Sequence, residues 1–316
     1  MTNNIKKQKE RFEKLKIQIK SDPYLNKLFE KKNFYYDFDD VKWFLKYAEI
    51  FNRYFESQNK LCKFNFDKEK CRQLNKGFQE TIIIKNNSLI LISKECNCNL
   101  INKIKKYFLF FNFKTNFFNF TFRNNCYLTN SRQRIIIFFS KWLKEEINNS
   151  YGTYIFGKPN IGKTFLSILF ANNIARKQEK NICFITNVEL INIVRTKIIQ
   201  KKISALKALN FFMNIDVLFL DDFGGEKVTT WSRDEVLFSL LNFRMNNNKS
   251  TFFTSNFSIK QLIFIYKNIK SNSSTNFNKK IFEIETIKSL RLIRRIKSLC
   301  YKNLSFNLDQ GYFEKN

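Results

Sequence analysis

Residues 152–170, "GTYIFGKPNIGKTFLSILF", decide the fold of this chain. An apolar run, GTYIF, leads into the pattern G-x-x-x-x-G-K-[ST] and then into a stretch with apolar residues at helical spacing. The chain has seven glycines in 316 residues, and two of them, Gly157 and Gly162, stand in this octet. Glycine lets backbone N–H groups turn towards an anion without a side chain in the way. The stretch therefore predicts a strand, a phosphate-binding loop and a helix.

The side chains of the loop predict that it binds a nucleoside triphosphate with Mg²⁺. Lys163 would supply charge to the β- and γ-phosphates, and the Thr164 hydroxyl would bind Mg²⁺. The helix that starts near Gly162 would direct its positive end at the phosphates. The candidate nucleotide-binding residues are Gly157, Lys158, Pro159, Asn160, Ile161, Gly162, Lys163 and Thr164.

Two further runs end in polar residues that suit nucleotide hydrolysis. VLFLDD, residues 217–222, reads as a buried strand that ends in two acids. Asp221 would hold Mg²⁺ through its water, and Asp222 would polarise the attacking water, unless Asp222 only caps a turn. Asn256 follows the apolar run TFFTS and would orient the same water, unless it is a turn residue.

The last predicted helix, IKSLRLIRRIKSL at 287–299, carries a basic face. Arg291 and Arg295 lie four residues apart on it, with Lys288 beside them. One interpretation is a solvated basic face. The other is an arginine that completes the ATP site of a neighbouring subunit.

From residue 131 onwards, apolar runs alternate with helical stretches. The expected strands are GTYIF, NICFIT, DVLFLDD and STFFTS, at 152–156, 181–186, 216–222 and 250–255. Strands that alternate with helices of this length indicate an α/β domain, with a parallel sheet and flanking helices. We expect this domain over 131–316.

The residues before it predict a small, mostly helical domain with a β-hairpin, over 1–110. Residues 39–56 place apolar side chains at helical spacing behind an Asp40 cap, and TIIIKNNSLILIS at 81–93 reads as two strands around a turn. A Phe-rich linker is expected over 111–130, packed against the next domain. Compositional drift explains its phenylalanines equally well.

Composition excludes some functions and leaves others open. The chain has no His, which excludes a Ser-His-Asp triad and any His-ligated metal. Lys and Arg outnumber Asp and Glu by 56 to 27, which fits a nucleic-acid partner or the drift of an AT-rich genome. The N-terminus is too polar for a signal peptide, and the Phe-rich stretch is too short and interrupted to span a membrane. We expect a cytoplasmic protein without a membrane partner.

Four cysteines flank the predicted hairpin as C-x₈-C and C-x-C: Cys62, Cys71, Cys96 and Cys98. Four thiols can hold Zn²⁺, although the C-x₂-C pairs typical of zinc sites are missing. The alternative is that they are buried thiols without a metal.

The stretch 217–262 resembles bacterial AAA+ replicative-helicase loaders, most closely the DnaI branch, which is related to DnaC and to IstB-like ATPases. LDD-x-G, W-x-RDEV, RM and TFFTSNF occur in this order, with GKPNIGKT upstream. The resemblance covers about 130–300. It implies an AAA+ P-loop domain that hydrolyses ATP to ADP and phosphate as a conformational switch, with ATP and Mg²⁺ as cofactors.

The resemblance also implies roles for single residues and for partners. Asp222 and Asn256 would be catalytic, Arg291 would be the arginine finger, and Arg295 would be a second arginine at the nucleotide. The N-terminal domain would bind the replicative DNA helicase, and the protein would help to place it on single-stranded DNA at replication initiation or restart. Such proteins self-associate with ATP or assemble on the helicase ring. Their N-terminal zinc module can use a His ligand, which this chain lacks.

Three other functions compete with a helicase loader. A transposition helper ATPase of the IstB type shares much of the core, but the cysteine-bearing hairpin domain favours the loader. A small-molecule P-loop kinase would need an acceptor pocket and a lid with arginines. A non-enzymatic zinc or DNA-binding module would leave the phosphate loop unexplained.

Overall fold

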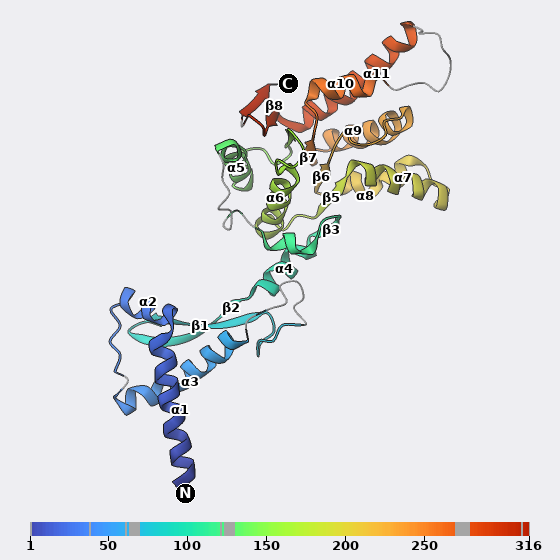
Figure 1. The fold of residues 1–316 in the computed structure, drawn as a ribbon. Coiled ribbons are helices and arrows are strands. Elements are labelled where there is room, and N and C mark those ends of the chain that lie inside the picture. The colour runs from blue at the N-terminus through green and yellow to red at the C-terminus, as the bar shows by residue number, and fades with distance from the viewer. Residues whose placement is uncertain are drawn as a thin grey trace. The chain divides into compact units, whose positions relative to one another are not determined.

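The computed structural model describes residues 2–37, 39–60, 62, 70–120, 122, 130–268, 279–310 and 312–315. The chain forms two compact units, Met1–Asn102 and Lys103–Asn316 (Figure 1). Each unit has its own hydrophobic core. None of the helices described here combines the length and the apolar character that crossing a membrane requires.

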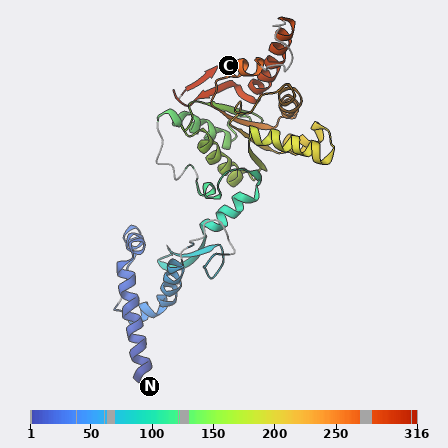
Figure 2. The same cartoon turned by 45° about the vertical axis from the view of Figure 1, so that its right-hand side comes forward.

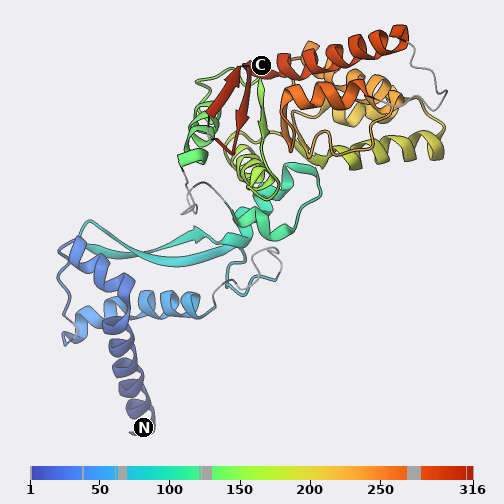
Figure 3. The ribbon, with the colours of Figure 1, turned by 45° about the horizontal axis from the view of Figure 1, so that its top comes forward.

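The first unit consists of helices and a hairpin (Figure 3). Its elements are α1 (Thr2–Ser21), α2 (Pro23–Lys31), α3 (Val41–Asn59), β1 (Phe78–Lys85) and β2 (Ser88–Glu95), and α4 (Asn97–Lys106) follows. The helix expected behind Asp40 is confirmed as α3, because the Asp40 carboxylate accepts a backbone N–H of its first turn. The buried side chains of Tyr47, Phe51 and Tyr54 pack in one cluster with Ile82 of the hairpin.

The expected hairpin is confirmed, and its turn explains its register. β1 and β2 pair antiparallel with Lys85 opposite Ser88, so two residues form the turn. These are Asn86 and Asn87, with φ of 50° and 53°. Two successive left-handed residues make a turn whose twist matches that of the strands, and Asn tolerates this conformation well.

The second unit is built on a seven-stranded sheet with the order β3-β5-β6-β7-β4-β8-β9. The first six strands in this order are mutually parallel, and β9 pairs antiparallel with β8. The strands are β3 (Phe108–Phe111), β4 (Gly152–Phe156), β5 (Ile182–Thr186), β6 (Val217–Asp221), β7 (Ser250–Ser255), β8 (Cys300–Asn307) and β9 (Tyr312–Lys315). The expected α/β fold with a parallel sheet is confirmed.

Helices cover both faces of this sheet (Figures 1 and 2). They are η1 (Thr115–Asn119), α5 (Asn130–Leu143), α6 (Lys163–Gln178), α7 (Asn187–Lys201), α8 (Ala205–Asn214), η3 (Ser232–Leu237), α9 (Phe238–Asn246), α10 (Ile259–Lys267) and α11 (Lys279–Leu299). Leu218 and Leu220 of β6 pack in the core shared with α7 to α11. Phe219, between them, points the other way, where its ring meets Phe170 of α6. Strands buried on both faces are typical of parallel sheets, and they explain the continuous apolar runs in the sequence.

The structure places the boundary between the units at 102/103, whereas the sequence predicts a first domain over 1–110 and a linker over 111–130. Residues 108–111 are not part of the first domain, because they form edge strand β3 beside β5. The Phe-rich segment that follows packs on the second unit: the Phe113 ring lies 5.3 Å from that of Phe184, and the Asn172 side chain donates to the carbonyls of Phe117 and Phe120. Residues 121 and 123–129 of the expected linker lie outside the described residues.

Candidate active site

The strand order brings three chain segments together at one edge of the sheet. Strand β4 lies between β7 and β8, and β7 lies between β4 and β6. Phe156 pairs with Ser255, and Leu220 pairs with Phe253. The residues that follow these parallel strands therefore meet at their carboxyl ends, where open α/β sheets bind ligands.

The phosphate loop connects β4 to α6, as the sequence predicts. Gly162 is the N-cap of α6 in the left-handed region, with a φ of 95°. A Cβ added there would lie 3.0 Å from Nη2 of Arg132, whose guanidinium also donates to the Ile161 carbonyl at 2.9 Å. The positive φ favours glycine at this position, and any larger residue would also displace the Arg132 guanidinium.

The ammonium group of Lys163 lies inside the loop. Its Nζ donates to the carbonyls of Gly157 and Lys158, at 2.8 Å and 2.7 Å, and to Oδ1 of Asn256 at 2.8 Å. Burial lowers the pKa of Lys163, although nearby carboxylates, Asp309 foremost, oppose the shift. This arrangement places a positive charge at the N-terminus of α6, where an anion is favoured.

Thr164 and Asp221 form the candidate Mg²⁺ site. The Thr164 hydroxyl donates to both carboxylate oxygens of Asp221, at 2.9 Å and 3.1 Å, and the Thr254 hydroxyl also donates to Asp221. Because its proton points at Asp221, the Thr164 oxygen presents its lone pairs to a cation. Oxygen donors of this kind suit Mg²⁺, which binds few protein ligands and keeps several waters.

Asp222 and Asn256 lie beside this pair. Asp222 has a φ of 53°, and its carboxylate accepts the Asn256 side-chain N–H at 3.0 Å. Its backbone N–H donates to the Thr254 hydroxyl at 3.1 Å. A Cβ added at Gly225 would lie 2.5 Å from the Asp222 carboxylate, so glycine leaves room for this side chain. A line of hydrogen bonds thus joins Lys163, Asn256 and Asp222.

The structure brings these predicted site residues together but leaves the two arginines elsewhere. The guanidinium groups of Arg291 and Arg295 lie over the Phe238 ring, 4.7 Å and 5.7 Å from its centroid. Arg295 also contacts the sulfur of Met245 at 3.9 Å. In the described part of the chain, neither arginine reaches the phosphate loop.

Three residues of the site escaped the sequence analysis: Arg132, Thr254 and Asp309. Thr254 stands two residues before Asn256. Because side chains alternate between the two faces of a strand, this spacing indicates that both side chains point to the same side. Arg132 and the Asp309 carboxylate, which accepts the Lys158 N–H at 3.0 Å, reach the loop from distant segments. Nothing in their local sequence indicates this.

The four N-terminal cysteines form a second candidate site. Their sulfur atoms all lie within 4.8 Å of one another. Cys71 and Cys96 are 3.8 Å apart, and Cys96 and Cys98 are 2.9 Å apart. Tetrahedral zinc with bonds of about 2.3 Å needs sulfurs about 3.8 Å apart, so the cluster fits the ion with small shifts.

The protonation of the cluster also favours a cation. Burial raises the pKa of Cys71, but hydrogen bonds from the backbone of Gly77 and Gln73 and from neighbouring thiols outweigh it and lower the pKa to about 7. Burial raises the pKa of Cys98 well above its ordinary value. A metal that binds the cluster displaces the thiol protons, and the lowered pKa of Cys71 reduces the cost of that step.

The sheet order and the site define the class of the second unit: an AAA+ P-loop domain with an additional strand, β7, between the strand before the phosphate loop and the strand with the paired acids. Residues 132–270 match the family described as IstB-like ATP binding protein. The second unit therefore contains an ATP-binding domain.

Comparison with individual proteins extends the similarity beyond this domain. The chain is 28 % identical over 278 residues to the replicative helicase loader DnaI of Bacillus subtilis (strain 168), a match that covers 81 % of this chain and 84 % of that protein. Crystal structures of DnaI and of the DnaC helicase loader align over 65 % and 61 % of this chain and over 96 % and 99 % of theirs. Their identities are 24 % and 22 %, and their TM-scores are 0.49 and 0.45. The sequence match to DnaI over 81 % of the chain confirms the resemblance to replicative helicase loaders.

Proposed function

We propose that the chain is an ATP-dependent loader of a replicative DNA helicase. Its second unit hydrolyses ATP to ADP and phosphate as a conformational switch, and its first unit binds the helicase. The observation that carries this proposal is the extent of the match to DnaI: 81 % of the chain is more than Lys103–Asn316 contains, so the match reaches into the first unit.

The geometry of the site supports a division of work between the paired acids. Asp221 is buried, already accepts two hydroxyl protons, and suits the support of Thr164 at Mg²⁺. Asp222 is only half-buried and accepts one hydrogen bond from Asn256, so its carboxylate is available to a water molecule. Bound Mg²⁺ would neutralise charge on the β- and γ-phosphates. Asp222 then polarises the attacking water, Asn256 orients it, and Lys163 holds the γ-phosphate.

The arginines of α11 act on a neighbouring subunit in this proposal. Both guanidinium groups are held over Phe238 rather than at the loop of their own chain. Arg291 is exposed and serves as the arginine finger, and Arg295 is the second arginine at that nucleotide. ATP would therefore favour self-association, or assembly of several chains on the helicase ring.

Single-stranded DNA is the proposed nucleic-acid partner, with α7 as its contact. The basic run RTKIIQKK, residues 195–202, lies on and just after α7. Arg195, Lys201 and Lys202 are exposed, and the Arg195 guanidinium lies 5.5 Å from the centre of the Trp231 ring. An exposed cationic helix with an aromatic neighbour suits phosphates and unpaired bases.

The test combines the full chain with the replicative helicase of its own cell and a single-stranded DNA template. With ATP, we expect a stable complex and more helicase on the template than without the chain. Lys163→Ala should lose ATP binding and this stimulation while keeping its fold, because the deleted charge contacts the loop and not the core. Lys177→Ala, an exposed position on the same helix, is the matched control. A chain that neither binds the helicase nor loads it contradicts the proposal.

A transposition helper ATPase remains the second candidate, because the IstB-like match covers the ATP-binding domain. The same binding experiment distinguishes the two. A helper of this type would stimulate a transposase and leave the helicase unbound.

A further inference from the structure

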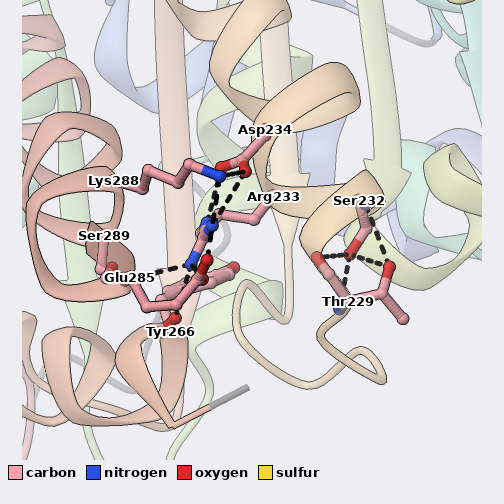
Figure 4. Close-up of polar contacts among 8 residues, drawn as sticks. All are labelled: Thr229, Ser232, Arg233, Asp234, Tyr266, Glu285, Lys288 and Ser289. Carbon is pink, nitrogen blue, oxygen red and sulfur yellow. Dashed lines mark hydrogen bonds and ion pairs between the residues drawn. The ribbon is translucent and has the colours of Figure 1, made fainter. Parts of the chain in front are cut away.

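Arg233 is a fully buried arginine that no step of the proposed reaction uses. Its guanidinium makes a two-point contact with Asp234, at 2.6 Å and 2.8 Å, and an ion pair with Glu285 of α11 (Figure 4). It also donates to the Tyr266 carbonyl at 3.2 Å. A buried charge is retained only where such partners compensate its loss of water.

The network around Arg233 joins three helical elements. Arg233 and Asp234 lie in η3, a π-helical turn of a kind that is rare and often found at functional sites. Glu285 and Lys288 lie on α11, and Lys288 pairs with Asp234 at 3.2 Å. Tyr266 belongs to α10 and is itself fully buried. The guanidinium therefore fixes α11 against η3 and α10.

The same face of α11 continues to the proposed arginine finger. Lys288, Arg291 and Arg295 follow one another at spacings of three and four, so they share one side of the helix. Opposite them, Asp234 and Phe238 are four residues apart on η3 and α9. Lys288 meets Asp234, and both arginines meet Phe238, so the contacts form a regular series between the two elements.

The network around Arg233 is also connected to the loop that follows Asp221 and Asp222. The hydroxyl of Tyr266 donates to the buried carboxylate of Glu226, which accepts the Gly224 N–H at 2.9 Å. The carbonyl of Tyr266 is an acceptor for Arg233. A series of hydrogen bonds through Tyr266 and Glu226 thus links Arg233 to the loop beside the chain's own nucleotide site, in addition to its contact with α11.

We infer that Arg233, with Glu285, is a positioning residue for Arg291: the buried ion pair holds α11 so that its arginine face is presented to the nucleotide of a neighbouring subunit. This inference rests on the proposed function, in which Arg291 acts in trans.

The test mixes two variants of the chain: a donor, which can only supply Arg291 to its neighbour, and an acceptor, which can only receive it. Lys163→Ala chains bind no ATP but keep Arg291, and Arg291→Ala chains bind ATP but lack the finger. Neither should hydrolyse ATP alone, and a mixture should recover activity. Donors that carry Glu285→Gln or Arg233→Lys in addition to Lys163→Ala should restore an ATP hydrolysis rate at least tenfold lower, even at saturating donor concentration. The acceptor's KM for ATP should not change.

Glu283→Gln in the donor is the matched control, because Glu283 is an exposed glutamate on the same helix. Glu285→Gln preserves size and Arg233→Lys preserves charge, and thermal unfolding shows whether each donor is folded at the assay temperature. A role in stability alone would lower the unfolding temperature and leave the restored rate of folded donors unchanged, which would overturn the inference. If the mixture of Lys163→Ala and Arg291→Ala chains recovered no ATP hydrolysis, the proposal that Arg291 acts in trans would be wrong, and this inference would be wrong with it.

Discussion

Asp221 and Asp222 are adjacent residues in different environments. Burial raises the pKa of Asp221, with the hydrogen bonds from Thr254 and Thr164 opposing it. Asp222 turns out of the strand through its positive φ and lies half-exposed beside Asn256. One carboxylate is therefore buried and held by two hydroxyl groups, whereas the other is open to water, a difference that the sequence DD alone does not reveal.

Asp222→Asn should bind Mg²⁺ and ATP with unchanged affinity and hydrolyse ATP at least about a hundredfold more slowly. The amide keeps the size of the side chain and its contact with Asn256 but cannot accept a proton from water. Binding of a fluorescent ATP analogue and steady-state phosphate release measure the two effects. Equal hydrolysis by both proteins would move the catalytic role elsewhere, Glu226 being the next candidate.

Asp221→Asn should stabilise the metal-free protein at neutral pH and abolish the Mg²⁺ dependence of nucleotide binding. The folded pKa of Asp221 is raised, so its favourable contribution is fully present below the unfolded pKa and is lost as the pH rises through the folded value. We expect a higher unfolding temperature for the variant in chelator at pH 7, and a difference that shrinks on acidification. A variant that is less stable than the parent at pH 7 would contradict this assignment.

At the level of elements, the fully buried Arg244 of α9 holds the end of α8. Its Nη1 donates to the carbonyls of Phe212 and Ile215, at 2.9 Å and 2.8 Å, and its Nη2 donates to Ser250 at 2.6 Å. The last carbonyls of a helix have no partner within it. A single guanidinium thus satisfies the C-terminus of α8 and ties it to β7.

Arg244→Met should lower the free energy of unfolding by about 3 kcal/mol, because it leaves several buried carbonyls without donors. Nucleotide affinity of the folded protein should change little, since the contacts of Arg244 lie at the end of α8 and at the start of β7, the end of that strand opposite to Asn256. Urea unfolding measures the first effect. Arg176→Met, at an exposed position of α6, is the control and should be near neutral.

The elements also show which features of the fold can be predicted from sequence. GTYIF and STFFTS coincide with β4 and β7, because strands buried on both faces are continuous apolar runs bounded by polar residues. The sequence does not predict strands β3, β8 and β9. Each lies towards an edge of the sheet, and β8 contains polar residues such as Lys302 and Asn303, so none of them has the signal of a central strand.

The site divides in the same way. Asp221 ends β6, Asn256 follows β7, and Lys163 and Thr164 begin the helix after β4. The alternation of parallel strands with helices is therefore enough to bring these four residues together. Arg132 and Asp309 depend on where the segments around the sheet pack, which short-range patterns do not encode. The ion pair between Arg233 and Glu285 could not be predicted for the same reason, since 52 residues separate the two partners.

For the whole molecule, the net charge of +29 is either a DNA-binding property or a property of composition. If α7 contacts single-stranded DNA, log K should fall with log salt by about 0.7 for each phosphate neutralised. Lys201→Ala with Lys202→Ala should reduce this slope. Arg176→Ala with Lys177→Ala removes the same charge from exposed positions of α6 and should not. Equal losses in both double variants would assign the binding to overall charge.

The two separate cores let the metal question be tested on the intact chain. We expect about one zinc per chain by elemental analysis, held by Cys62, Cys71, Cys96 and Cys98. A chelator should release it and unfold the hairpin region, which circular dichroism and amide exchange detect, while ATP binding by the second unit persists.

Acidification should also release zinc, because protons compete with the metal for the cysteine sulfurs. The pKa of Cys71 is lowered to about 7, so we expect this release well below that pH. Cys71→Ser should carry little zinc, whereas Cys300→Ala, a buried cysteine of the second unit, should carry as much as the parent chain. Metal-free parent protein with a cooperatively folded hairpin would contradict the zinc site. The apolar contacts of Ile82 and Leu89 with α3 would then hold the first unit without it.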